Sequence, residues 1–304
     1  MVPLVSDLVV LDIRFLGAPL GSSSRFHGGE MTDLVTISLG AGVQSSTMYR
    51  MAALGEFDKM PDYAIFADTQ QEPEWVYESL DSLEKDHGDK IPIIRATAGD
   101  LGDAVRKGSN TTGGRFAAVP FWVARVDGSE APGRRQCTSE YKINVVKLAI
   151  REILGLKPRQ RALGKHHVEE WIGISRDEAL RMKPSRYNWI TSRWPLIEKM
   201  MSRQSCKQWL EDHGYPEPKK SACLFCPYRK ESEYAKWKDN EPELFEEACK
   251  IDELIRSTGT MRGTERPQYV LRTLKPLREA VDTGSEGPQN GDLFINECEG
   301  MCGV

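Results

Sequence analysis

The sequence has little cysteine and no long apolar run. Seven cysteines among 304 residues are too few for a disulfide-stabilised secreted scaffold. No run reaches the roughly 18 apolar residues that a membrane-spanning helix needs. Charge of one sign is not in excess either, since the formal net charge is −4, so only a local patch could attract nucleic acid or a membrane.

Repeats, low-complexity tracts and a secretion-signal pattern are also lacking. We therefore expect a cytoplasmic protein with no membrane partner, in which clustered cysteines serve metal or redox chemistry. What is present is ordinary for a globular protein, with 39% hydrophobic and 28% charged residues. The length predicts two domains, or one large α/β domain with a tail.

The chain divides into four segments by composition. Residues 1–31 are rich in Gly and Ser towards their end, and we expect them to be a disordered extension outside the fold. We expect an α/β domain over 32–200, a helical cysteine-bearing region over 201–280, and a mobile tail over 281–304.

Short buried strands alternate with amphipathic helices in the second segment. This alternation predicts a doubly wound, mainly parallel sheet. The expected strands cover 34–38, 63–67, 91–94 and 168–174, and the expected helices cover 45–54, 73–85, 101–107 and 139–153.

A glycine-rich loop follows the first of these strands and opens a helix. It reads S-L-G-A-G-V-Q-S-S-T over residues 38–47. Small residues let the backbone approach an anion, and a helix N-terminus offers unpaired N–H groups and partial positive charge. The loop is neither a Rossmann fingerprint, because Ser45 stands at the last glycine position, nor a Walker loop, because G-K-[ST] is absent. The alternative is a tight strand–helix turn without a ligand.

This loop resembles the pyrophosphate-binding loop, S-G-G-x-D-S-[ST], of the adenine-nucleotide α-hydrolase superfamily. Gly40, Ala41 and Gly42 match its first three small positions and Ser45 and Ser46 close it, whereas Gln44 stands where ATP-cleaving members have Asp. We expect seven nucleotide-binding residues in this loop. They are Ser38, Gly40, Ala41, Gly42, Gln44, Ser45 and Ser46. The looser loops of the 3′-phosphoadenylyl sulfate (PAPS) reductase branch tolerate such changes. The resemblance implies an α/β domain with flavodoxin-like strand order.

A second segment, F-A-D-T-Q-Q-E-P-E over residues 66–74, is similar to the A-D-T-G-x-E-x-P-E segment of PAPS reductases and of phage and DNA-phosphorothioation relatives. Asp68 at a strand end would hold the ribose, or Mg²⁺ through water if ATP is the nucleotide. A capping or turn role is the alternative for Asp68.

Positive charge is concentrated in one stretch. Residues 125–165 contain ten Lys or Arg against four Asp or Glu, which predicts a polyanionic ligand such as nucleotide phosphates or a nucleic-acid backbone. Arg135 and Lys142 lie in an R-x-C-x-x-x-x-K element similar to that of the reductase branch, so we expect them to bind the nucleotide. For Lys147 and its neighbours Arg151 and Lys157 we favour a solvated helix face.

Arg176 and Arg181 follow the strand at 168–174. Similar segments in the phage and phosphorothioation relatives imply that both arginines face the substrate.

Cys223 and Cys226 form a C-x-x-C pair, a spacing that chelates one metal centre well. The resemblance implies a [4Fe-4S] cluster on Cys137, Cys223 and Cys226. Cys206 would supply the ligand that iron–sulfur members take from a Cys-Cys pair. The alternatives are a zinc on Cys206, His213, Cys223 and Cys226, a redox disulfide, or no metal.

The terminal tail carries Cys298 and Cys302. PAPS reductases have a nucleophilic cysteine in a similar E-C-G segment, which implies catalytic roles here. Incidental thiols in a disordered tail are the alternative.

Together these features predict an adenine-nucleotide enzyme of sulfur metabolism. It would reduce a sulfonucleotide with thioredoxin or a second thiol, or transfer sulfur with ATP from a persulfide donor such as a cysteine desulfurase, with nucleic acid as an acceptor. The alternative is a nucleotide- or nucleic-acid-binding subunit of a DNA-modification or phage-defence system that has no turnover of its own.

Overall fold

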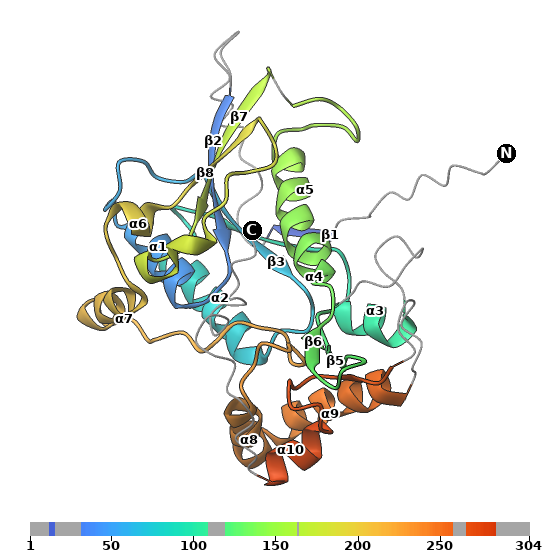
Figure 1. Ribbon diagram of the computed structural model, residues 1–304. Helices are drawn as coiled ribbons and strands as arrows, with labels where there is room; N and C mark the ends of the chain where they lie inside the picture. Colours follow the sequence, from blue (N-terminus) through green and yellow to red (C-terminus); the bar gives the residue numbers. More distant parts are fainter. Residues whose placement is uncertain (1–11, 16–31, 109–118, 163, 258–265, 284–304) are drawn as a thin grey trace, which may run out of the picture.

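The computed structural model describes residues 12–15, 32–108, 119–162, 164–257 and 266–283 (Figure 1). Its main feature is a six-stranded sheet in the order β1-β4-β3-β2-β7-β8, in which every neighbouring pair except β1–β4 is parallel. The strands are β1 (Asp12–Phe15), β2 (Thr32–Leu39), β3 (Tyr63–Asp68), β4 (Ile93–Thr97), β7 (His166–Ile172) and β8 (Ile190–Arg193). The doubly wound α/β fold is thereby confirmed.

The order of the parallel strands corrects the sequence-based prediction. Counted along the chain, they run 3-2-1-4-5, whereas a flavodoxin-like sheet runs 2-1-3-4-5. The chain leaves β2 towards β3 and β4, and then crosses back to place β7 on the other side of β2. The order therefore reverses between β2 and β7, where open α/β sheets leave a crevice for ligands.

Helices cover both faces of this sheet (Figure 1). The α-helices of the described residues are α1 (Val43–Ala53), α2 (Glu74–His87), α3 (Leu101–Lys107), α4 (Gln136–Thr138), α5 (Asn144–Ile153), α6 (Pro195–Glu198), α7 (Arg203–Asp212), α8 (Glu231–Asn240), α9 (Pro242–Ser257) and α10 (Leu277–Thr283). Of these, α3, α8, α9 and α10 pack in a separate core beside the sheet. Strand residues alternate between two cores: Ile37 packs with α1, α2 and α7, whereas Leu34 packs with α5. This alternation follows from the two-residue period of a strand.

Apart from the cores on its two faces, a separate core, called the second core below, lies beside the sheet. It joins α3, α8, α9 and α10 to a small antiparallel sheet in the order β6-β5-β9, and Phe121, Tyr234 and Phe225 are buried at its centre. The strands are β5 (Trp122–Ala124), β6 (Glu130–Pro132) and β9 (Gln268–Tyr269). None of the helices in the described part of the chain is both long enough and apolar enough to cross a membrane.

The segment expected to stand outside the fold contributes an edge strand. Residues 12–15 form β1, which pairs antiparallel with β4. The rest of 1–31 lies outside the described residues.

The helix predicted from residue 139 is continuous with α4 but contains an irregular turn. Ser139–Ile143 is π-helical and connects α4 to α5. Such turns accommodate an extra residue and frequently occur at functional sites. In this chain the π-helical turn carries Lys142.

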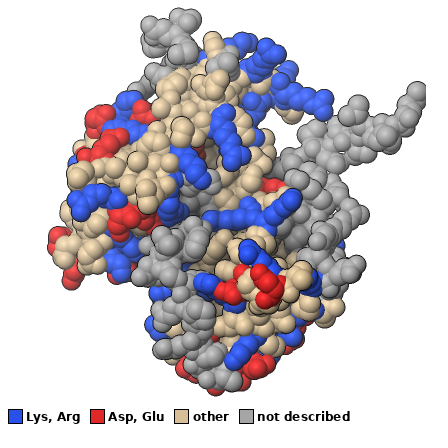
Figure 2. All heavy atoms as spheres, viewed as in Figure 1, with Lys and Arg blue, Asp and Glu red and all other residues tan. Residues whose placement is uncertain are grey.

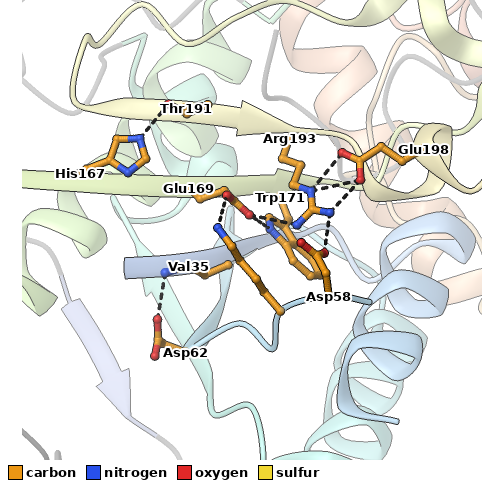
Figure 3. A network of polar contacts seen from close by, with 10 residues as sticks. Val35, Asp58, Asp62, His167, Glu169, Trp171, Thr191, Arg193 and Glu198 are labelled. Carbon is orange, nitrogen blue, oxygen red and sulfur yellow. Dashed lines mark hydrogen bonds and ion pairs between the residues drawn. The ribbon is translucent and has the colours of Figure 1, made fainter. Parts of the chain in front are cut away.

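A polar network fixes β7 and β8 to the connection that follows α1 (Figure 3). The guanidinium of Arg193 donates to Glu198, Asp58 and Glu169, and it lies 5.0 Å from the ring centre of Trp171. The indole of Trp171 also donates to Glu169 at 2.7 Å. Because Glu169 and Trp171 share one face of β7, this network lies on the opposite face from Glu170.

We expect Arg193→Met to lower the free energy of unfolding by about 1.5 kcal/mol, since it leaves the half-buried Glu169 with fewer donors. Denaturant unfolding measures the loss. Arg278→Met is the matched control, because Arg278 pairs with Glu246 and Glu253 at an exposed site and should matter much less. Equal losses in the two variants would contradict the structural role of Arg193.

Candidate functional site

A cleft of about 340 Å³ lies at the carboxyl ends of the parallel strands. Ser38 and Gly40 from the end of β2, Ala67 from β3 and Ser192 from β8 line it. The cleft occupies the crevice created where the strand order reverses, the usual place for a ligand in such folds. Its other walls come from the segment 135–150 and from residues 183–187.

Positive charge dominates the lining of this cleft. Among the described residues, five cationic side chains stand around it against one carboxylate, that of Glu170. The cations are Arg135, Lys142, Lys147, Lys183 and Arg186. Lys and Arg also gather across the middle of the face shown in Figure 2. An anionic ligand therefore suits the cleft.

Lys147 corrects our expectation of a solvated helix face. Its ammonium donates to the Tyr187 hydroxyl at 2.8 Å and to the Asn144 side chain at 3.3 Å, and it lines the cleft. The amphipathic pattern of α5 placed Lys147 outside the core correctly. The pattern could not show that residues 183–187 lie opposite it.

The glycine loop forms the floor of the cleft at one end. Ala41 has a left-handed backbone (φ 55°), and α1 then begins after Gly42 with no side-chain cap from a described residue. Ser45 accepts from the Gly40 N–H at 3.2 Å, which holds the bend. The Ser46 hydroxyl is buried without a hydrogen-bond partner in the described structure. Ser38, Leu39 and Gly40 line the cleft, and the other loop residues lie buried behind them.

Gln44 is held in a buried polar network instead of facing the cleft. Its amide donates to Glu178 at 3.2 Å, and its carbonyl accepts from Arg203 at 2.7 Å. Burial raises the pKa of Glu178, and Arg181 opposes this from 2.9 Å away. An aspartate at position 44 would place a second negative charge beside Glu178, so glutamine suits this environment.

The remaining predicted polar residues lie outside the cleft. Asp68 accepts from the Gln70 N–H at 2.7 Å and from the Tyr77 hydroxyl at 2.9 Å, so it serves the turn after β3. Burial raises the pKa of Asp68. Arg176 is exposed, and Arg181 pairs with Glu178. Neither arginine lines the cleft.

A small cavity lined by thiols adjoins the cleft. Cys137, Cys223 and Cys226 line it, while Arg135, Thr138 and Lys142 line both spaces. Lys142 contacts the buried Glu72 at 3.4 Å, and the Cys223 sulfur lies 3.2 Å from the Thr69 hydroxyl. Three of the four predicted cysteine ligands therefore line one cavity together with Arg135 and Lys142 of the R-x-C-x-x-x-x-K element.

Cys206 does not join these thiols. It is fully buried on α7 against α1, in a different core from Cys223, and burial raises its pKa to about 12. His213 stacks on Trp209 at the end of α7. No three His, Cys, Asp or Glu side chains converge as a metal site within the described ranges. Neither the four-cysteine cluster nor the proposed zinc set therefore fits the described residues.

The terminal thiols, Cys298 and Cys302, lie outside the described residues. Cys249, by contrast, is buried in the second core, and burial raises its pKa to about 12. It is a small apolar packing residue.

The sequence patterns did not identify several residues that line the cleft. Lys183 and Arg186 gave no signal, because nothing local shows that their loop folds over the sheet. Glu170 did give a signal, because it occupies the position between the buried apolar residues Val168 and Ile172 on one face of β7. An acid at such a position is unusual unless it serves a purpose.

We expect Gly173→Ala to disturb the base of the loop. An added Cβ would lie 2.9 Å from the Ser45 Cα and 3.0 Å from its nitrogen, so β7 and α1 would have to separate. Overpacking of this kind costs about 1–3 kcal/mol. Thermal unfolding tests it, and an unchanged melting temperature would contradict the close approach.

No protein-family model matches the chain, and no curated protein matches it. The resemblance to the adenine-nucleotide α-hydrolases therefore rests on the motifs in the sequence. The geometry of the cleft is an independent basis for a functional argument.

Proposed function

We propose that the protein is an adenine-nucleotide-binding enzyme of sulfur metabolism, similar to PAPS reductases. The observation that carries this proposal is that three residues line both the cleft and the small cavity beside it. Arg135, Thr138 and Lys142 separate a cationic cleft from a cavity lined by three cysteines. A phosphate-binding site next to thiols suits a sulfur-bearing or sulfur-accepting nucleotide.

In this proposal the phosphate groups of the nucleotide bind near the glycine loop and the cationic side chains of the cleft. Ser38 and Gly40 lie at the end of β2 and line the cleft. Arg135 and Lys142 line the same cleft from the segment that precedes α5. Arginine and lysine bind phosphate oxygens through charge-assisted hydrogen bonds. The sulfonucleotide is favoured over ATP, because Gln44 offers no carboxylate for the Mg²⁺ that accompanies ATP, and its amide is already held by Glu178.

In the reductase reaction a cysteine thiolate attacks the sulfonyl sulfur of PAPS. The sulfur–oxygen bond to the phosphate breaks, and adenosine 3′,5′-bisphosphate leaves with the electron pair. A second thiol, from thioredoxin or from this chain, then attacks the cysteine sulfur, so that sulfite leaves and a disulfide remains. Cys298 is the proposed nucleophile, and Cys302 is a candidate second thiol.

The reaction is tested by titrating the protein with PAPS and with ATP in a calorimeter, followed by assays for sulfite and pyrophosphate. We expect binding of PAPS, and sulfite release in the presence of a thiol. Pyrophosphate release from ATP would instead support ATP-dependent sulfur transfer. If neither nucleotide binds, the proposal fails.

Cys298→Ser should abolish sulfite release but leave nucleotide affinity unchanged, because the thiol acts in chemistry and not in phosphate binding. Cys249→Ser, at a buried thiol of the second core, should leave the chemistry per folded molecule unchanged. If the wild-type protein binds the nucleotide but releases neither sulfite nor pyrophosphate, and Cys298→Ser and Cys302→Ser retain that binding, the protein is a binding subunit without turnover.

The double variant Lys183→Met/Arg186→Met should weaken binding of PAPS about tenfold, since two cations leave the cleft. Lys236→Met/Lys250→Met removes the same charge from exposed positions on α8 and α9 and is the matched control. Titrations at two salt concentrations measure the effect. An equal loss in both pairs would mean that only net charge matters.

A further inference from the structure

Glu170 is the carboxylate among the described residues that line the cleft. It lies on β7 directly opposite Thr36 of β2 and Ser192 of β8. These neighbours carry hydroxyls, and that of Thr36 is buried without a partner in the described structure. A carboxyl group therefore stands in a row of small polar residues at the centre of a buried sheet.

The charged groups that surround this row stand on other elements. They are Lys147 on α5, Arg135 and Lys142 on the segment before it, and Lys183 and Arg186 in the loop opposite, with Tyr187 beside them. On β2 and β8, the residues opposite Glu170 carry hydroxyl groups and no charge. Among the described contacts, none of these cations pairs with Glu170, and the Lys147 ammonium is held by Tyr187 and Asn144.

Among the described contacts no cation pairs with Glu170, so nothing there offsets the burial of its carboxyl group. Enclosure by the sheet and α5 raises its pKa to about 7, and burial is the cause. Both forms of the carboxyl group are then accessible near neutrality. The neutral form donates one hydrogen bond and accepts another, whereas the ionised form only accepts.

The position of Glu170 separates it from the phosphate end of the cleft. Ser38, which borders the glycine loop, is opposite Ile172, two residues further along β7. At about 3.3 Å per residue, Glu170 lies roughly 7 Å back from that level. A carboxylate repels phosphate, so the uncharged part of a nucleotide suits this end.

The surroundings of Glu170 suit an aromatic base. Val146 and Ile150 of α5 and Ile190 of β8 line the same cleft as apolar side chains. Ligand pockets typically combine such apolar walls with a few polar groups that fix orientation. Among the described residues, Glu170 is the carboxyl group at this end.

We propose that Glu170 determines base specificity, its neutral carboxyl group pairing with the Watson–Crick edge of adenine. The acid O–H donates to the ring nitrogen N1, and the carbonyl oxygen accepts from the N6 amino group. Guanine presents two donors on the same edge and would require the ionised carboxylate. This inference rests on the proposed adenine-nucleotide function and specifies which residue reads the base.

The test uses the full chain and adenosine 3′,5′-bisphosphate, the product of the proposed reaction, with guanosine 3′,5′-bisphosphate for comparison. If adenine binds only the neutral carboxyl group, affinity for the adenosine compound should fall about fifteenfold between pH 7 and pH 8.5. Glu170→Gln should abolish this fall, because an amide donates and accepts at every pH. Glu170→Ala should weaken binding at both pH values.

Proton uptake provides a readout that does not depend on a variant. Calorimetry of the wild-type protein at pH 7.5, in buffers of different ionisation enthalpy, should show about three quarters of a proton taken up with the adenosine compound. Glu170→Gln should lack this component, which separates it from protonation of the ligand phosphates.

An identical pH dependence in the wild-type protein and in Glu170→Gln would overturn the inference and leave the proposed function intact. Tighter binding of the guanosine compound, rising with pH, would also overturn it and would assign a guanine site. If no adenine nucleotide binds to any form at any pH, the proposed function itself fails.

Discussion

The parallel pairing of β2 with β7 is the constraint on which the rest of the site depends. It runs from Thr32 opposite His166 to Ser38 opposite Ile172, and it joins two strands that are far apart in the sequence. At its end, Gly173 packs against the first turn of α1. A side chain there would force the strand away from the loop, so the close approach requires glycine.

This pairing also brings together residues with different chemical tasks. The glycine loop follows β2, and the polar segment with Glu178 follows β7. Gln44 connects the two through its side chain. On the inner face of the same ladder, Glu170 stands beside Thr36. One strand pair therefore positions the glycine loop and the acidic group of Glu170 beside one cleft, with the buried Gln44–Glu178 network behind the loop.

Much of the fold could be predicted because its signals are local. Runs of β-branched residues and helical spacing of Val146 and Ile150 identify strands and α5 from short windows. The strand order could not be predicted in the same way, since it depends on which side of β2 the chain places β7. Arg135 and Lys142 were found through their motif and their concentration of charge. Cys206 was misplaced because spacing along a chain does not show which face of a sheet a helix covers.

The π-helical turn at Ser139–Ile143 has a consequence for the wall between the two spaces. One residue of an α-helix corresponds to a rotation of about 100°. Deleting a single residue from this turn would restore regular winding, and it would swing Arg135 and Cys137 around the axis relative to α5. The wall between the two spaces thus depends on a local surplus of one residue, and a change in length there would be more damaging than most changes in side chain.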